Sequence, residues 1–487
     1  MSGQISIIGL KSRFIGGLTM KKFLGVFGAL SIVCLSGLIA CGADESSEDM
    51  TATLPFPAWS FEHWVWEDES TQGSAEALVN GYLERDIPVG AIIIDSPWST
   101  GYSTFEFDTE LFPEPQAMID GFHANGVKVM LWTVSGINDD AGEIYQEGLD
   151  NNYFLRASPD DNVSTTNWWK GDGRMVDYFN PEAVKWWHGL VDRALAMGID
   201  GWKCDGLDYN VGGLGIDDPT TYSPTLGRDV TRNEYSDAYY RDFYYYTREK
   251  LGDDRIITAR PVDNYGFRGV GDEVVQFAPK DVIVAGWVGD QDGTFDGLVN
   301  ALDNLYWSAK AGYLAFGSDI GGYREDSNFS QGRSKEVFLR WAQLGAFNPV
   351  MENGGGGEHH PWAFDDETVS IYRRFAWLHH ALVPYLMQAS VPRWEAGTSL
   401  MQFVDDDDYA YFLGDDIFVW PIATADWSIT IVAPDDLEGR WVCPFDPSKV
   451  LEAGTRLDWE VPLDAYPVFV REGSAVGETL EGVLAQY

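Results

Sequence analysis

Short apolar runs recur along the first 390 residues, separated by stretches whose apolar positions have helical spacing. Eight of these runs have the length of buried strands. They span residues 91–95, 128–134, 175–178, 201–205, 255–260, 282–287, 313–319 and 347–351. Residues 181–197 show the intervening pattern, an amphipathic helix with a proline at its start. Eight β/α units predict an α/β fold, a closed (β/α)8 or TIM barrel, whose functional face is the carboxyl end of its strands.

The pattern changes after residue 390, where short runs with alternating apolar and polar residues follow one another. These runs span residues 409–413, 417–421, 429–432, 440–445 and 467–471. Such spacing predicts a small antiparallel β domain at residues 391–487. The catalytic barrel is then expected at residues 55–390, after a polar tether at residues 41–54.

The first 40 residues have the pattern of an export signal. Lys21 and Lys22 precede an apolar run at residues 23–33, and the small residue Ala40 precedes Cys41, as in a lipoprotein cleavage box. The apolar run is shorter than the ~20 residues of a membrane span. We therefore expect a signal peptide at residues 1–40 and lipidation of Cys41, which makes this an exported bacterial lipoprotein anchored in the periplasm or at the outer membrane.

Composition narrows the classes of partner. The chain has 33 basic and 76 acidic side chains, a net charge of −43, and this excess of negative charge would repel a nucleic acid. Of the four cysteines, Cys34 and Cys41 fall in the export segment, and Cys204 lies within a predicted strand as a small apolar residue. No metal-ligand spacing is present, so we expect neither a metal nor a cofactor. The 20 tryptophans are compatible with binding of sugar faces.

Ionisable residues stand at the ends of several predicted strands. They are Asp95, Asp205, Arg260, Asp290 and Asp319. Each of the four aspartates alone could cap a helix or shape a turn. A barrel, however, brings its strand ends around one cleft, and two carboxylates across a cleft are the groups that glycoside hydrolysis requires. The sequence holds no nucleophile elbow, phosphate-binding loop or zinc-type histidine cluster that would indicate another chemistry.

Six motifs, in this order along the chain, resemble glycoside hydrolase family 31. They are DIPVGAIIIDSPW (86–98), VDYFNPEAVKWW (176–187), GIDGWKCDGLD (198–208), GWVGDQDGTFDGL (286–298), FGSDIGGY (316–323) and RWAQLGAFNPVM (340–351). The similarity runs from about residue 55 to the C-terminus. It implies a retaining exo-α-glycosidase with an oligosaccharide or another α-glycoside as its substrate, and it leaves the oligomeric state open.

The resemblance also implies roles for individual residues. Asp205 corresponds to the nucleophile and Asp290 to the acid/base, with the neighbouring Asp292 as a weaker alternative acid. The expected substrate-binding residues are Asp95, Trp98, Arg260, Trp287 and Asp319. In such a mechanism the sugar forms an ester with Asp205, and the two catalytic carboxyl groups lie about 5 to 5.5 Å apart.

Two departures from the family concern the ends of the barrel. The family usually carries a β-sandwich before the barrel, which we expect to be absent because fewer than twenty residues separate Cys41 from the first similar segment. The rim of the pocket would then come from Trp64, Trp66, Glu67 and Asp68. After the eighth strand the family usually has an arginine and a histidine, which this chain lacks, and Glu352 or His360 is the candidate substitute for binding substrate.

A third departure is Lys203, two positions before the nucleophile, where the family has an apolar or aromatic residue. A lysine in the cleft would donate to sugar hydroxyls and keep Asp205 ionised. This arrangement is similar to that of α-galactosidases in related barrel families, so it favours α-galactosidase over α-glucosidase or α-xylosidase. The alternatives are that Lys203 pairs structurally with Asp208 or another acid, that the enzyme is a transglycosylase, or that the chain is a catalytically silent carbohydrate-binding lipoprotein.

Overall fold

The computed structural model describes residues 56–160, 166–168, 170–206, 221–266, 275–325, 333–404 and 408–487. The predicted signal peptide, Cys41, the tether and Asp208 lie outside these residues. Within the described ranges, no helix is long and apolar enough to cross a membrane.

Eight parallel strands form the centre of the fold. In chain order they are β1 (His63–Glu67), β2 (Ala91–Ile94), β3 (Lys128–Thr133), β7 (Gly201–Cys204), β10 (Ile256–Ala259), β13 (Ala285–Val288), β14 (Ala315–Ser318) and β15 (Met351–Asn353). Each strand pairs with its neighbour in this order, and β1 pairs with β15. A parallel bridge between Asp319 and Glu352 then joins the ends of β14 and β15. The prediction of a (β/α)8 barrel is confirmed.

Two strand predictions were wrong. The first barrel strand is His63–Glu67, which sequence analysis missed, and residues 175–178 are not a barrel strand. Met175 instead ends β6 (Gly171–Met175), the middle strand of an inserted antiparallel sheet with β4 (Gly136–Asn138) and β5 (Thr166–Trp168). An apolar run is equally suited to either sheet, because both bury it. The last barrel strand also begins at Met351, four residues later than predicted.

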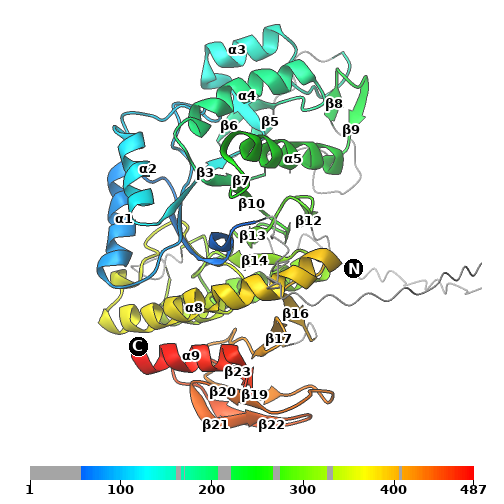
Figure 1. The fold of residues 1–487 in the computed structure, drawn as a ribbon. Coiled ribbons are helices and arrows are strands. Elements are labelled where there is room, and N and C mark those ends of the chain that lie inside the picture. Colours follow the sequence, from blue (N-terminus) through cyan, green and yellow to red (C-terminus); the bar gives the residue numbers. More distant parts are fainter. Residues whose placement is uncertain are drawn as a thin grey trace, which may run out of the picture. The chain divides into compact units, whose positions relative to one another are not determined.

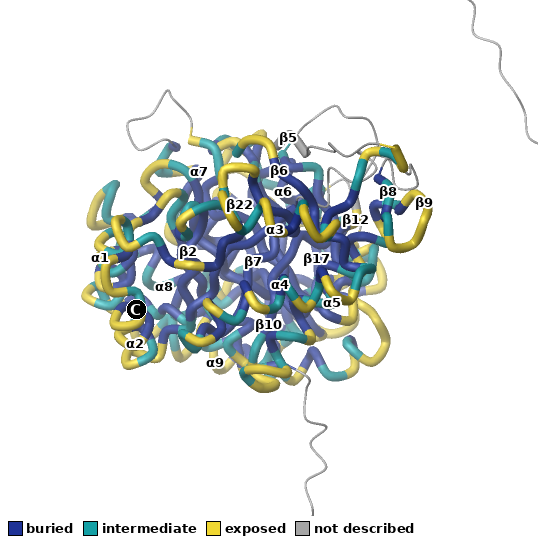
Figure 2. Tube along the Cα trace, turned by 90° about the horizontal axis from the view of Figure 1, so that it is seen from above, coloured by how far each residue is buried: buried dark blue, intermediate teal, exposed yellow. Residues whose placement is uncertain are grey.

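Helices surround the strands, and buried chain runs through the centre while exposed turns lie around it (Figure 2). They are α1 (Gln72–Glu84), α2 (Pro115–Ala124), α3 (Glu143–Asp150), α4 (Pro181–Leu195), α5 (Arg232–Leu251), α6 (Phe295–Lys310) and α7 (Lys335–Ala346). The helix predicted from residue 181 is confirmed as α4, whose first backbone N–H groups are capped by the side chain of Asn180. Short hairpins β8 (Thr221–Ser223) with β9 (Arg228–Val230) and β11 (Val262–Asp263) with β12 (Val275–Gln276) follow β7 and β10.

The long helix α8 (Asp366–Ala396) lies between the barrel and the C-terminal strands (Figure 1). It continues through Pro384 and Pro392. Leu382, Val383 and Leu386 are buried, and this packing of its apolar face offsets the hydrogen bonds that prolines remove.

The chain after α8 forms the predicted antiparallel β domain. One sheet has six strands in the order β16 (Met401–Phe403), β17 (Tyr411–Leu413), β18 (Ile417–Val419), β23 (Val468–Arg471), β20 (Trp441–Cys443) and β21 (Asp446–Leu451). A second pairs β19 (Ser428–Val432) with β22 (Arg456–Glu460), and α9 (Ala475–Gln486) ends the chain.

Candidate active site

The carboxyl ends of the barrel strands carry the candidate residues. Asp95 directly follows β2, Asp205 follows β7, Arg260 follows β10, Asp319 follows β14, Glu352 lies within β15, and Asp290 comes two residues after β13. Because parallel strands end at the same edge of a barrel, these side chains meet. The contacts among them show that residues more than 200 positions apart in the sequence form one cluster.

Arg260 is the centre of this cluster. Its Nε lies 3.3 Å from Asp205 Oδ1, its Nη1 lies 2.5 Å from Asp263 Oδ2, and its Nη2 donates to Asp290 Oδ1. The guanidinium also lies over the ring of Trp287, 4.9 Å from the ring centroid. One buried cation therefore holds both predicted catalytic carboxylates close together.

Asp205 is held as a carboxylate. Its Oδ1 accepts the backbone N–H of Gly206 at 2.9 Å, and its Oδ2 accepts the indole N–H of Trp132 at 3.2 Å. Burial by itself raises the pKa of Asp205, but the charges of Arg260 and Lys203 outweigh burial and hold that pKa below its usual range. An ionised carboxylate is the form that a nucleophile needs.

Asp290 has a different environment. Its side chain is 25% exposed, against 12% for that of Asp205. Its backbone adopts φ of +66°, a left-handed conformation that is uncommon for a residue with a side chain. The Asp319 carboxylate accepts its N–H at 3.1 Å, and Arg324 donates to its carbonyl oxygen, so both ends of this backbone unit are fixed. The more exposed carboxyl is the one better placed to reach a leaving group.

Lys203 is a second buried cation beside Trp287. Its ammonium group lies 2.9 Å from Asp95 Oδ2, 3.4 Å from the centroid of the Trp66 ring and 4.9 Å from that of Trp287. Burial lowers the pKa of Lys203, but nearby carboxyl groups, Asp95 first, outweigh it and raise that pKa. Burial also raises the pKa of Asp95 to about 6, despite the neighbouring ammonium. The structural pairing considered for Lys203 is therefore present, with Asp95 as its partner.

Asp319 and Glu352 are two buried carboxyl groups on adjacent strands. Burial is the main reason that the pKa of each is raised, and their proximity to one another contributes for Asp319. Both oxygens of Glu352 and Oδ1 of Asp319 are without a hydrogen-bond partner in the described part of the chain. Buried polar atoms without partners are uncommon, and they often belong to sites that bind a ligand.

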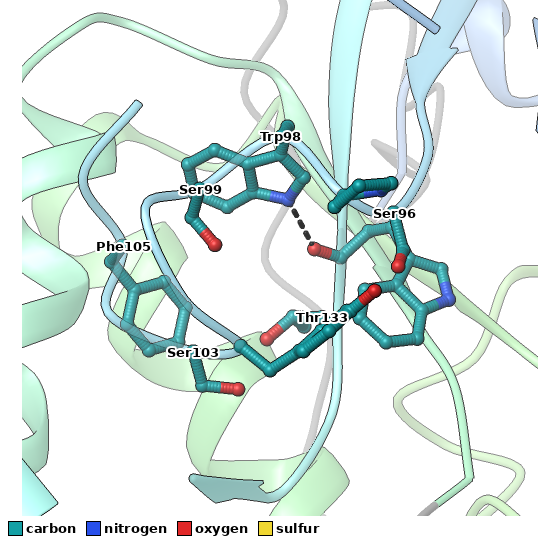
Figure 3. Close-up of a pocket in the computed structure, with 9 residues that line it drawn as sticks. Ser96, Trp98, Ser99, Ser103, Phe105 and Thr133 are labelled. Atoms are coloured by element: carbon teal, nitrogen blue, oxygen red, sulfur yellow. Dashed lines mark hydrogen bonds between the residues drawn. The ribbon is translucent and has the colours of Figure 1, made fainter. Parts of the chain in front are cut away.

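Two of the sequence-predicted residues lie outside this cluster. Trp98 donates its indole N–H to the carbonyl oxygen of Trp132 at 2.8 Å, and both residues line a small cavity (Figure 3). His360 stacks on Trp362, with 4.4 Å between ring centroids, and pairs with Glu358. Trp98 can thus support Trp132, whereas the structure places His360 on a separate part of the loop after β15.

Of the rim residues proposed from the sequence, Trp64 and Trp66 point to the same face of β1, and Trp64 is nearer its amino end. Trp66 contacts Lys203, whereas Trp64 donates to the Trp59 carbonyl at 3.2 Å. Asp68 accepts the Tyr323 hydroxyl at 3.0 Å. A side chain at Gly354 would collide with the Trp66 ring. Trp66 therefore lies against Gly354, in the segment after the eighth strand where the family usually has a histidine.

Sequence analysis missed Trp132 and Asp263. Trp132 is the penultimate residue of β3, a strand that is apolar on both faces, so no alternation in the sequence marked which of its side chains faces the cluster. Asp263 follows Arg260 by three residues and accepts N–H groups from Tyr265 and Gly289, both at 2.9 Å. Within the described ranges, no group of three histidine, cysteine or acidic residues is arranged to hold a metal ion.

Comparison with known proteins identifies related chains. The model for the TIM-barrel domain of glycosyl hydrolases family 31 matches residues 53–389, and the model for the C-terminal domain of that family matches residues 397–476. Alpha-glucosidase 2 from Bacillus thermoamyloliquefaciens is 25% identical over 469 residues, which cover 92% of this chain and 57% of that protein. An alpha-xylosidase from Lactiplantibacillus pentosus is 27% identical over 453 residues, which cover 88% and 56%.

The fold is also similar to that of solved structures. A family 31 alpha-xylosidase from a soil metagenome, complexed with xylose, has a TM-score of 0.73 and 21% identity, with 87% of this chain and 65% of that chain covered. The chain spans little more than half the length of the curated relatives described above.

Proposed function

The chain belongs to glycoside hydrolase family 31, and on that premise we propose that it is a retaining exo-α-glycosidase, which hydrolyses terminal α-linked sugars. The observation that carries this proposal is the contact of one guanidinium, that of Arg260, with both Asp205 and Asp290. Retaining enzymes use two carboxyl groups that lie close together, whereas inverting enzymes leave room between them for a water molecule.

The two carboxyl groups have separate roles in this mechanism. Asp205 attacks the anomeric carbon while Asp290 gives its proton to the leaving oxygen, and a glycosyl ester forms on Asp205. Asp290 then takes a proton from water, which attacks the ester and releases the sugar with its original configuration. The neighbouring cations Arg260 and Lys203 support the ionised form of Asp205. The greater exposure of Asp290 supports proton exchange with the leaving group and water.

The proposal is tested with a panel of nitrophenyl α-D-galactoside, α-D-glucoside, α-D-xyloside and α-N-acetylgalactosaminide. We expect one of them to be hydrolysed by the wild type and none by Asp205→Ala. Asp292→Asn is the matched control, because the Asp292 side chain is 67% exposed and lies two residues beyond Asp290. No turnover of any α-glycoside would favour the silent carbohydrate-binding lipoprotein instead.

Within this class we propose α-galactosidase activity. The buried Lys203 and its partner Asp95 place a donor and an acceptor side by side in the cluster, where they can contact neighbouring hydroxyls of one sugar. The names of the relatives, alpha-glucosidase and alpha-xylosidase, favour a second candidate, the same chemistry on glucosides or xylosides. The relative kcat/KM values on the panel decide between these sugars.

We also propose that the protein is exported and lipidated at Cys41, on the strength of the signal-like residues before that cysteine. Metabolic labelling with a radioactive fatty acid should mark the wild type and not Cys41→Ser. Label on neither chain would contradict the lipoprotein proposal without affecting the proposed chemistry.

A further inference from the structure

Glu352 is a buried acid in the candidate active site. The proposed mechanism gives it no role. The residue is fully buried, and neither carboxyl oxygen lies within hydrogen-bond distance of a donor among the described residues, although the Trp66 indole is close enough to lower its pKa. The charged groups near it are the carboxyls of Asp95 and Asp319 and the cations Lys203 and Arg260. A buried carboxyl without a partner costs free energy, so its presence in a binding site is best explained by a ligand that supplies hydrogen-bond donors.

The balance of charge in the cluster limits which ligand this can be. Among the described residues, this cluster holds two cations, Lys203 and Arg260, and six carboxyl groups, those of Asp95, Asp205, Asp263, Asp290, Asp319 and Glu352. Both cations are already engaged, Lys203 by Asp95 and Arg260 by three aspartates. At the rim, Lys170 pairs with Glu69, and Arg324 donates to the backbone of Asp290 and Tyr265. A negatively charged sugar would therefore meet carboxyl groups and, among the described residues of the cluster, no cation that is not already paired.

We propose that Glu352 is a specificity-determining residue that hydrogen-bonds a hydroxyl or ammonium group of the sugar, so that the pocket takes uncharged or positively charged sugars and rejects those carrying a carboxylate, sulfonate or phosphate. This inference rests on the proposed function, because it assumes that the sugar binds at the Asp205–Asp290 cluster. The inference specifies the charge of the sugar, which the proposed function leaves open.

The first test measures kcat/KM on matched nitrophenyl glycosides of the sugar that the panel identifies: the neutral sugar, its 6-carboxylate and its 2-amino analogue. We expect the wild type to prefer the neutral sugar over the carboxylate by at least about 100-fold, since like charges in contact cost several kcal/mol. At pH 8, above the raised pKa of Glu352 of about 7, Glu352→Gln should reduce this ratio about tenfold. Glu460→Gln, an exposed acid on β22, is the control and should leave the ratio unchanged. Hydrolysis of the carboxylate within threefold of the neutral sugar would overturn the inference.

The second test needs no turnover. Trp66 and Trp287 lie against Lys203, so their fluorescence should report a sugar that enters the cluster. Titration of Asp205→Asn should show binding of D-galactose or D-glucose and at least about tenfold weaker binding of D-galacturonate or D-glucuronate. Equal binding of neutral and acidic sugars, or binding of neither, overturns the charge selection. Selective binding without hydrolysis by the wild type would instead contradict only the proposed enzymatic activity.

Discussion

Lys203 and Asp95 form an ion pair of 2.9 Å in which both side chains are buried, with exposed fractions of 4% and 8%. Lys203 lies in β7 and Asp95 follows β2, so the pair spans β3, the strand between them. Two charges removed from water are stable only if each satisfies the other. The pair thus links the geometry of the candidate active site to the stability of the barrel.

Breaking this pair should destabilise the protein strongly. Lys203→Met leaves the Asp95 carboxyl buried without its cation, which typically costs about 3–5 kcal/mol in the free energy of unfolding. In a double-mutant cycle, adding Asp95→Asn should recover part of that loss, because no buried charge then remains unpaired. Urea unfolding measures each variant, and Lys185→Met, an exposed lysine on α4, is the control. Strictly additive losses would show that the two side chains do not depend on one another.

Residues that form the barrel were predictable where a strand is apolar along its whole length. The strand His63–Glu67 was missed because it begins with a histidine and ends with a glutamate. The structure satisfies His63 by long-range contacts, since its Nδ1–H donates to the Pro88 carbonyl at 2.7 Å and its Nε2 accepts the Tyr372 hydroxyl at 2.8 Å. Burial accordingly lowers the pKa of His63 to about 3. Such partners, 25 and 309 residues away, leave no local signal.

Glu352→Gln should stabilise the fold at high pH. Burial raises the pKa of Glu352 above its usual value of 4.5, so in the folded state this acid stays protonated at pH values where it is ionised in the unfolded chain. Unfolding then releases a proton, and stability falls as the pH rises from 4.5 toward the raised folded-state pKa. Glutamine removes that loss.

The gain is measured as the difference in unfolding free energy between Glu352→Gln and the wild type at pH 4.5 and at pH 8. We expect it to be larger at pH 8 by about 1–3 kcal/mol. The exposed Glu460→Gln should show the same stability as the wild type at both values. A pH-independent difference for Glu352→Gln would mean that Glu352 titrates as in the unfolded chain.

The separate roles of Asp205 and Asp290 predict different responses to the leaving group. A dinitrophenolate leaves without being protonated, so Asp290→Asn should cost about 10²–10⁴-fold in kcat/KM on a disaccharide but far less on a dinitrophenyl glycoside. Asp205→Asn removes the nucleophile and should abolish hydrolysis of both. Asp292→Asn should resemble the wild type. If Asp292→Asn showed the leaving-group dependence instead, that residue would be the acid.

Site residues were predictable from the sequence where they follow a predicted strand and lie within a motif of the family. Asp205, Arg260 and Asp290 were placed in the cleft on that ground, and Lys203 was singled out because it departs from the family; the structure brings the four together. Asp263 was not predicted, because its position in the cluster depends on the turn at Arg260 and on the N–H of Gly289, 26 residues away. His360 was included for its chemistry alone, and the loop after β15 turns it toward Trp362 instead.

The effect of a substitution at Gly354 on KM should depend on the Trp66 ring. Any side chain at Gly354 meets the Trp66 ring, and that ring in turn covers the Lys203 ammonium group. Gly354→Ala should therefore displace the indole and weaken the cation–π contact, which is worth about 2 kcal/mol when buried. We expect a KM increased about tenfold or more, together with a lower melting temperature.

The single variant Trp66→Ala should increase KM by itself, and Gly354→Ala added to it should have little further effect, because the collision is gone. Gly482→Ala, on the C-terminal helix where a methyl group meets nothing within 4 Å, is the control for glycine replacement. Equal effects of Gly354→Ala in the presence and absence of the Trp66 ring would show that the glycine serves the backbone alone.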